Sequence, residues 1–395
     1  MHPTERRLLT LSIASQASIS IVQWGLGALG PDLADRYDLS AASLGLLINA
    51  TAIGNAIALV PAGGLVDRIG PRRPLMIAGT ASGLLVAVAG LAGSAVVLGI
   101  AFVVAGMLGA LVAVAATVSV FHGFPAERRG FALGLRQMSV SLGGLIAAVM
   151  LPALAGLSGV PLALAAAGLA TAACAFVFGH ACARGPLVQS ESRRALLPVD
   201  AMRQPGMWRL FASGVALVGA LTAVLTFSVP AIRDGGGSRL TGSILFALVS
   251  LSAMAARVLW GRVADHGGGS RRIATLNDVA ALTVVLALAT ALVWPCGTVV
   301  RIVALTLLSF GALGFNGVLY LAAGELAGAA RAGQAVGWMS TALFGGGALA
   351  AVPLGLLVDH HGYRSLWLAA AASAAVGWML VRSLRHGAIG SGKPS

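Results

Sequence analysis

The chain has 395 residues, of which 58% are apolar and only 10% are charged, and its formal net charge is +13. A soluble domain carries about a quarter charged residues, so this composition excludes an ordinary soluble protein and indicates a polytopic membrane protein. A soluble protein of this charge would suggest a nucleic-acid partner, but we expect none here, because the basic residues are distributed as a membrane topology requires.

Twelve apolar segments are long enough to cross a bilayer, for which a helix needs about 20 residues. They are residues 8–30, 41–63, 74–94, 96–120, 131–153, 159–181, 206–231, 240–261, 273–294, 299–323, 333–357 and 363–381. We therefore predict an all-α membrane protein with twelve transmembrane helices.

The basic residues orient these helices. With both termini inside, nineteen of the 26 lysines and arginines fall on the cytoplasmic side. Those outside are Arg36, Arg233, Arg239, Arg301 and Arg364. An excess of positive charge on cytoplasmic loops sets topology, so we expect a multi-pass protein of the inner membrane with both termini cytoplasmic.

The first segment carries a polar stripe. Ser12, Gln16 and Ser20 follow one another at i, i+4 spacing, and Gln23 and Trp24 come next. Such a stripe should turn away from lipid, either to line a cavity or to form hydrogen bonds between helices. Gln16, Gln23 and Trp24 are candidate substrate contacts.

The turn after the second segment is rich in glycine and charge, and we call it the signature turn. It reads Gly63-Gly64-Leu65-Val66-Asp67-Arg68-Ile69-Gly70-Pro71-Arg72-Arg73. Gly63 leaves room for another helix end. Asp67 can lie at the N-terminus of a neighbouring helix, where backbone N–H groups favour an anion. The arginines hold the turn on one side of the membrane.

Arg136 lies inside the segment 131–153, about 9 Å along its helix from Gly130. It could contact an anionic substrate, or it could be a gate residue that pairs with Glu127 or Glu325.

Residues 184–205 are polar, carry arginines and contain three prolines. We expect them to form a cytoplasmic linker. It would join an N-terminal six-helix bundle, residues 1–183, to a C-terminal bundle, residues 206–395, that ends in a short cytoplasmic tail.

A shorter copy of the signature turn reads Gly261-Arg262-Val263-Ala264-Asp265-His266-Gly267, and Gly261 stands 198 residues after Gly63. We call it the second signature copy. Self-similarity at this scale predicts two pseudo-symmetric bundles, one per half of the chain.

Arg257 is a charge inside an apolar segment. It stands eight residues before Asp265, which is about 12 Å along a helix and close to the middle of a bilayer core about 30 Å thick. No Asp or Glu lies in the middle third of any predicted helix, so an anionic substrate would suit this guanidinium group. The alternative is a structural arginine bonded to backbone carbonyls or to Asn316. Asn316 and Tyr320, at i, i+4 spacing, are further candidate contacts.

The pattern Gly63-x-Leu65-x-Asp67-Arg68-x-Gly70-x-Arg72-Arg73 resembles the signature between helices two and three of the major facilitator superfamily. The stretch from Gly261 to Asp265 resembles its degenerate copy between helices eight and nine. The resemblance implies that superfamily's fold and alternating access around a site between the halves. It also implies a conformational gate at Gly63, Asp67, Arg68, Gly70, Arg72, Arg73, Gly261 and Asp265.

The spacing Arg257-x-x-x-Gly261 resembles the monocarboxylate and nitrate carriers of the superfamily, which place an anion-binding arginine four residues before this glycine. Nitrate carriers have a matching arginine in the first half, where this chain has Leu59, so nitrate and nitrite are disfavoured.

These observations predict a secondary transporter of a small organic anion, expected to be a carboxylate moved with a proton. The chain has no His-Glu-x-x-His motif and no phosphate-binding loop. We therefore expect no enzymatic activity, no metal and no cofactor. The expected partners are the substrate, a proton and the lipid bilayer, and the chain is expected to be a monomer.

Two alternatives remain. Proton-driven drug efflux is weakened because the fifth helix lacks the Gly-Pro pair of drug/proton antiporters and the first six segments lack a deep acid. A transporter-like sensor is weakened because the linker and the tail are too short for an added domain.

Overall fold

The computed structural model describes residues 3–39, 41–182, 199–266 and 269–390. Residues 184–198 of the predicted linker, Gly267 of the second signature copy and the last five residues of the tail lie outside these ranges. Within the described ranges every regular element is a helix. The prediction of an all-α protein is therefore confirmed.

The chain divides into two compact units. Unit 1 comprises Met1–Phe124, Ser139–Ala201 and Gly328–Trp338. Unit 2 comprises Pro125–Met138, Met202–Ala327 and Met339–Ser395. Each unit thus includes one short segment from the half of the sequence that mainly builds the other unit. We call residues 125–138 and 328–338 the exchanged segments.

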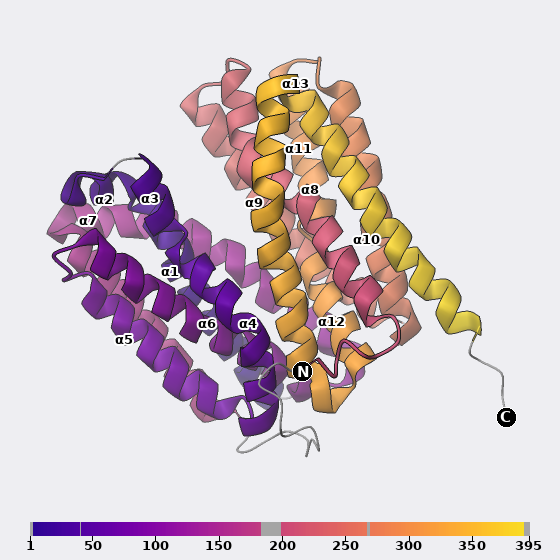
Figure 1. Cartoon of the computed structure of the whole chain (residues 1–395), viewed down its shortest axis with the longest axis horizontal. Helices are drawn as coiled ribbons and strands as arrows, with labels where there is room; N and C mark the ends of the chain where they lie inside the picture. The colour runs from indigo at the N-terminus through magenta and orange to yellow at the C-terminus, as the bar shows by residue number, and fades with distance from the viewer. Residues whose placement is uncertain (1–2, 40, 183–198, 267–268, 391–395) are drawn as a thin grey trace. The chain divides into compact units, whose positions relative to one another are not determined.

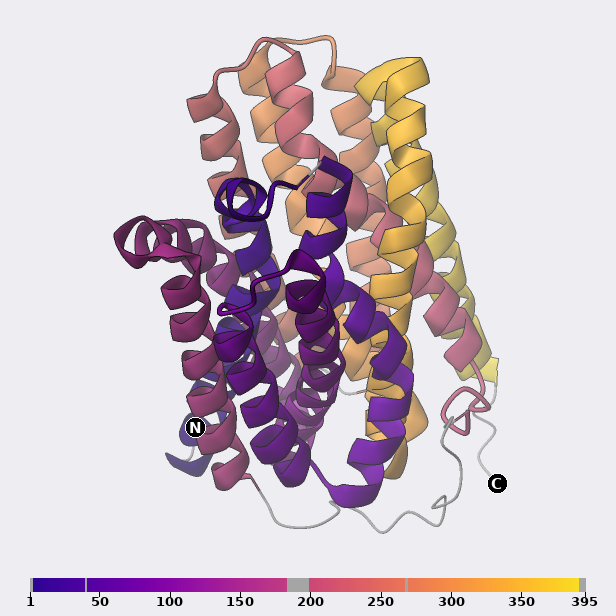
Figure 2. The same cartoon turned by 60° about the vertical axis from the view of Figure 1, so that its left-hand side comes forward.

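Unit 1 contains the helices from indigo to magenta that Figure 2 brings forward. They are α1 (Pro3–Ala28), α2 (Gly30–Tyr37), α3 (Ala41–Ile48), α4 (Ala50–Ile69), the π-helix η1 (Pro74–Ala78), α5 (Gly79–Ala89), α6 (Ala95–Gly123) and most of α7 (Arg129–Ala181). The predicted segment 41–63 is divided, because a turn at Asn49 separates α3 from α4. Ser94 starts α6, since its hydroxyl accepts a hydrogen bond from the Val96 N–H at 3.2 Å.

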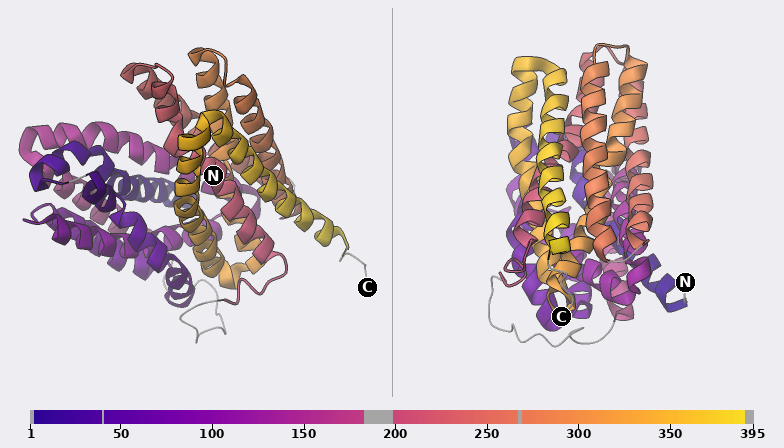
Figure 3. Two further views of the ribbon diagram at one scale, coloured as in Figure 1. Left: turned by 45° about the horizontal axis from the view of Figure 1, so that its top comes forward. Right: turned by 90° about the vertical axis from the view of Figure 1, so that its right-hand side faces the viewer.

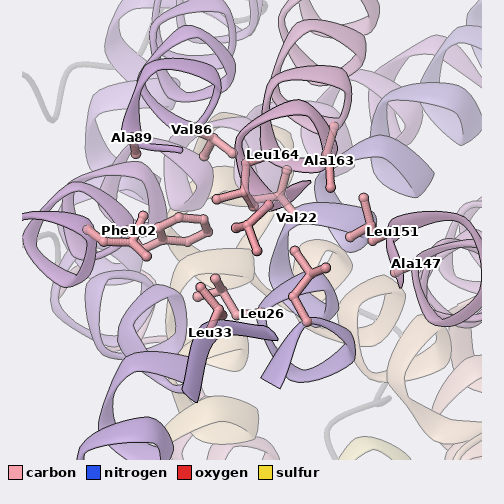
Figure 4. Packing of buried hydrophobic residues seen from close by; sticks show 14 of the residues in the cluster. Val22, Leu26, Leu33, Val86, Ala89, Phe102, Ala147, Leu151, Ala163 and Leu164 are labelled. Atoms are coloured by element: carbon pink, nitrogen blue, oxygen red, sulfur yellow. The ribbon is translucent and has the colours of Figure 1, made fainter. Parts of the chain in front are cut away.

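The core of unit 1 joins α1, α2, α6 and α7. Leu26, Leu33, Phe102, Leu151 and Leu164 are among the buried side chains that meet there (Figure 4). Lipid is as apolar as these side chains, so close packing rather than exclusion of water holds the helices together. The core therefore depends on the fit of its side chains.

Unit 2 contains most of the second half of the chain and the first exchanged segment. Its elements are η2 (Ala126–Arg128), the start of α7, α8 (Met207–Asp234), α9 (Arg239–Asp265), α10 (Gly269–Val293), α11 (Thr298–Ala312), α12 (Phe315–Ala327) and α13 (Ala332–Gly390) from Met339 onward. The short helix η3 (Ala329–Arg331), just before α13, belongs to unit 1. α10 and α11 lie side by side in the right-hand view of Figure 3. The predicted segment 299–323 is divided at Leu313, where α11 ends and leaves a carbonyl group without an intrahelical partner.

Two helices fold back on themselves, and Figure 1 shows this for α13. In α7 the kink lies at Ser158 and Gly159, and in α13 it lies at Gly362. Gly159 has φ 82° and ψ 169°, and Gly362 has φ 74° and ψ 179°. This backbone region is essentially restricted to glycine. The kinks match the predicted boundaries between 153 and 159 and between 357 and 363.

The described residues contain eight helical spans long and apolar enough to cross a membrane. Two of them, Ala126–Ala181 and Ala329–Leu384, are 56 residues long and contain the kinks, so each supplies two limbs. The shorter apolar helix Pro74–Ala89 and α1 occupy the positions of the other two predicted segments. All twelve predicted segments are therefore accounted for.

Candidate functional site

The signature turn caps the start of another helix. Asp67, near the end of α4, accepts hydrogen bonds from the backbone N–H groups of Gly333, at 2.9 Å, and Gln334, at 3.0 Å. These N–H groups belong to the first turn of α13, where no intrahelical acceptor is available. A carboxylate there also interacts favourably with the helix dipole. The prediction that Asp67 lies at a helix N-terminus is confirmed.

Glycines let the backbones of α4 and α13 touch at this point. A Cβ atom at Gly63 would lie 2.5 Å from the Gly333 carbonyl oxygen, and one at Gly337 would lie 2.7 Å from the Leu59 carbonyl oxygen. Real Cβ atoms do not approach oxygen so closely, so any larger residue at either place would push the helices apart.

The second signature copy makes the same contacts in unit 2. Asp265 accepts hydrogen bonds from the N–H groups of Gly130, at 2.6 Å, and Phe131, at 2.7 Å. Gly261 faces the Gly130 backbone as Gly63 faces Gly333. Each signature copy therefore holds the exchanged segment of its own unit, and the repeat in sequence is also a repeat in contacts.

The arginines of the signature turn have different surroundings. Arg72 donates to the His180 carbonyl oxygen at 3.4 Å, which attaches the turn to the last turn of α7. Arg68 is half-buried and Arg73 is exposed, while Gly70 ends α4.

The second signature copy has an ion pair beside it that the sequence analysis missed. Arg272, in α10, pairs with Glu325 and donates to the Ala126 carbonyl oxygen. Glu325, which was considered as a partner for Arg136, thus has another arginine as its partner. The Arg262 guanidinium group lies 4.7 Å from the centre of the Phe131 ring.

Two arginines are buried in unit 2. Arg257 in α9 is 6% exposed, and Arg136 in α7 is 2% exposed. Arg257 donates to the carbonyl oxygens of Leu313, at 3.1 Å, and Gln137, at 2.8 Å. Arg136 donates to the side-chain oxygen of Gln137 at 3.3 Å. The carbonyl contacts expected of a structural Arg257 are therefore present, and the Leu313 carbonyl is available because α11 ends there.

Tyr320 adds a phenol to these arginines. Its hydroxyl oxygen accepts a hydrogen bond from Ser340 at 3.2 Å and lies within electrostatic reach of both guanidinium groups. We call Arg136, Gln137, Arg257, Tyr320 and Ser340 the arginine cluster. Gln137 and Ser340 were not predicted, although the position of Gln137 beside Arg136 was an available signal.

Asn316 lies one turn before Tyr320 in α12. Within the described part of the chain its buried side-chain oxygen has no hydrogen-bond partner. A buried amide oxygen without a donor is costly, so this atom could accept a hydrogen bond from a bound molecule.

The polar stripe of α1 belongs to unit 1. Ser12, Gln16 and Ser20 are buried, which confirms that the stripe turns away from lipid, and the Gln16 amide donates to the Ser20 hydroxyl at 3.3 Å. Gln23 is half-buried, and Trp24 is 52% exposed.

No group of His, Cys, Asp or Glu among the described residues could hold a metal ion.

These features define a class of protein: a multi-pass helical membrane protein with two related capped turns and buried positive charge. Internal repeats of this kind occur in many transporter folds. The family model described as the Major Facilitator Superfamily matches residues 13–351, and the chain belongs to that superfamily.

Curated relatives and solved structures agree with this assignment. Two uncharacterized MFS-type transporters of Mycobacterium tuberculosis, one from strain CDC 1551 / Oshkosh and one from strain ATCC 25618 / H37Rv, are each 26% identical over 365 residues, which are 91% of this chain and 81% of the relative.

Three solved structures share the fold. The proton:xylose symporter XylE has a TM-score of 0.79 at 13% identity and covers 96% of this chain and 95% of its own. The human organic anion transporter MFSD10 has a TM-score of 0.78 at 14% identity, and the match covers 96% of this chain and 100% of MFSD10. The transporter FucP in the outward conformation has a TM-score of 0.76 at 16% identity, and the match covers 97% of this chain and 99% of FucP. The chain therefore has the all-α fold of this superfamily.

Proposed function

We propose that the protein is a secondary active transporter that moves a small organic anion, a carboxylate, together with a proton. The observation that carries this proposal is the arginine cluster. Arg136 and Arg257 are buried near the same phenol, and the middle third of every predicted helix lacks a carboxylate.

The chemistry of the cluster suits a carboxylate. Arginine presents parallel N–H donors in a fixed fork that matches two carboxylate oxygens. Two of the Arg257 hydrogen bonds go to neutral carbonyl oxygens, and an anion is a stronger acceptor than either. A substrate carboxylate would therefore take donors from these carbonyls, with the Tyr320 hydroxyl as an additional donor.

The membrane potential supports coupling to a cation, and we propose that this cation is a proton. Moving one elementary charge against 100 mV costs about 2.3 kcal/mol, so an anion entering a cell with a negative interior needs a compensating cation. Proteins of this fold include a proton:xylose symporter and an organic anion transporter, so the fold is compatible with both features.

The signature contacts supply the gate in this proposal. The capped turns face the cytoplasm of the inner membrane, as the arginine distribution predicts. Asp67 and Asp265 hold the exchanged segments while the cytoplasmic side is closed, and both contacts break when it opens. The protein works as a monomer in the bilayer, with both termini in the cytoplasm.

Ligand-induced thermal stabilisation of the purified protein tests the anion site. A panel of small carboxylates, amines and drugs is added to the wild type and to the variants Arg257→Lys, Arg257→Gln and Tyr320→Phe. We expect a carboxylate to raise the melting temperature of the wild type. Loss of a charged hydrogen-bond partner weakens binding by about 10- to 150-fold. Arg257→Lys keeps part of the binding, and Arg257→Gln keeps almost none.

Two comparisons make this test specific. Arg233→Gln removes an exposed arginine of unit 2 and should leave binding unchanged. Tyr320→Phe removes only a hydroxyl group, so it should weaken carboxylate binding. Because Ser340 also loses its acceptor, the ligand-free protein should be destabilised by about one neutral hydrogen bond, about 0.5–1.5 kcal/mol. Unchanged affinity for every acid in Arg257→Gln would disprove the anion site, and stabilisation by amines alone would favour drug efflux. In proteoliposomes, carboxylate uptake should make the external medium more alkaline.

A further inference from the structure

Residues 199–202, which we call the connecting segment, are attached to the gate through Ala201. The backbone N–H group of Ala201 donates to the Gln334 side-chain oxygen at 3.2 Å. Both residues are buried, Ala201 at 0% exposure and Gln334 at 3%. The backbone N–H of Gln334 donates to Asp67 at 3.0 Å. One residue therefore binds the signature turn through its backbone and the connecting segment through its side chain.

Both residues of this contact belong to unit 1, and each is close in sequence to a point where the chain leaves that unit. The chain leaves unit 1 directly after Ala201, and α13 leaves unit 1 after Trp338, four residues beyond Gln334. The gate contact and two passages of the chain between units are therefore within a few residues of one another.

The second signature copy has a different arrangement at the equivalent place. There Phe131 takes the position of Gln334, because its N–H group is the second that the aspartate binds. The Phe131 ring packs against Arg262 of the same signature copy. A side chain that accepts a hydrogen bond from the connecting segment is thus a feature of the first gate contact and not a requirement of the fold.

We propose that Gln334 is a positioning residue that couples the connecting segment to the gate. This inference rests on the proposed function, in which the start of α13 leaves Asp67 when the gate opens. If Gln334 moves away, the buried N–H of Ala201 loses its acceptor, which is unfavourable. The connecting segment therefore stabilises the closed gate, and it must move or rearrange each time the gate opens.

Hydrogen–deuterium exchange of the full-length protein in lipid nanodiscs tests this coupling without a known substrate. Gln334→Met keeps the length of the side chain and the backbone bond to Asp67 but removes the acceptor. We expect faster exchange of the amides at 199–202 and also of those at 333–334. Because the lost hydrogen bond is neutral, we expect the exchange rates to rise by about 2- to 12-fold.

The matched control is Thr171→Val. Thr171 is also buried in unit 1, and its hydroxyl donates to the Ser18 carbonyl oxygen at 3.0 Å. This variant removes the buried hydroxyl that donates to the carbonyl oxygens of Ser18 and Ala167, but it should leave exchange at 199–202 and 333–334 unchanged. Unchanged exchange around Phe102, in the core of unit 1, shows that each variant is folded.

The outcomes separate the two proposals. If Gln334→Met accelerates exchange only at 199–202, the bond is a local attachment and the coupling is wrong. Asp67→Asn serves as the test of the gate itself, since it should accelerate exchange at 333–334 through the backbone bond. If Asp67→Asn has no effect there, the gate fails regardless of Gln334. If Asp67→Asn acts and Gln334→Met does not, only the coupling fails.

Discussion

At the scale of single residues, Asp67 and Asp265 are better suited to cap their helix starts than any other side chain would be. Each binds two adjacent backbone N–H groups at a helix start, so each needs two acceptor oxygens and a negative charge. Glutamate has the charge but a longer side chain, and asparagine has the length but only one acceptor oxygen.

Asp67→Asn and Asp265→Asn should each loosen their own helix start. In each variant one charge-assisted hydrogen bond is lost, and the backbone N–H that made it then faces the amide NH₂ group of asparagine. This loss costs about 1.5–3 kcal/mol, which shifts the equilibrium toward the open gate by about 10- to 150-fold. Hydrogen–deuterium exchange should accelerate at Gly333 and Gln334 in the first variant and at Gly130 and Phe131 in the second. Transport should be lost in Asp67→Asn while expression is retained. A normal transport rate would remove Asp67 from the gate.

The sequence predicted what Asp67 does but not where its partners lie. An acid between glycines at a helix end indicates a cap, whereas the capped residue is 266 positions away in Gly333 and only folding brings it near. The same limit applies to Arg257. The depth of Arg257 in the membrane follows from counting residues along its helix. Its hydrogen bond to Leu313, however, depends on a helix break that the residues around Leu313 do not predict.

At the scale of elements, the kinks in α7 and α13 were the most predictable features. Each follows a run of about 20 apolar residues and places glycine at the turn. The helix breaks at Asn49 and Leu313 were not predicted, because the apolar run continues through both positions. The hydropathy of a segment depends on its composition and gives no information on a local change in backbone geometry. The Leu313 break matters most for the arginine cluster, since it frees a carbonyl group for Arg257.

Gly159→Ala should destabilise unit 1, because alanine at φ 82° and ψ 169° costs about 1–3 kcal/mol. Gly156→Ala, three residues earlier in the same helix, is the matched control. Neither site has an atom within 4 Å of an added Cβ, apart from the Pro161 ring at 3.5 Å from position 159. In a helix interior, alanine is favoured over glycine by about 0.5–1 kcal/mol. Thermal unfolding should therefore show a lower melting temperature for Gly159→Ala and an unchanged or higher one for Gly156→Ala. Equal melting temperatures would contradict this account of the kink.

At the scale of the whole molecule, the three native cysteines report topology. Cys296 is exposed in the loop between α10 and α11, which the proposed orientation places outside the cell. Cys174 is half-buried within α7. Burial raises the pKa of the Cys182 thiol, so little reactive thiolate forms there. An impermeant maleimide should therefore label intact cells at Cys296.

Two variants check this orientation. Cys296→Ser should abolish the labelling of intact cells. Arg203→Cys in that background adds an exposed thiol just before α8, which should react only after the membrane is permeabilised. Labelling of position 203 in intact cells would reverse the proposed orientation.

The predicted bundles and the observed units divide the chain differently. The bundles are simple halves of the sequence, 1–183 and 206–395, which is all that a repeat and a linker can define. The units follow contacts, so they include the exchanged segments 125–138 and 328–338. No pattern in either segment indicates which unit it joins, because the partner of each is far away in the chain.

The exchanged segments have a consequence for the ancestry of such a chain. A half-length polypeptide that ended before Met202 would contain Asp67 but not the amides of Gly333 and Gln334 that this aspartate binds. Two identical half-length chains could satisfy both aspartates only by lending their segments to each other, as the partners in an isologous dimer do. Gene fusion of such a dimer would preserve this reciprocity in one polypeptide. The two halves could then diverge, and Gln334 and Phe131 are an equivalent pair whose side chains now make different contacts.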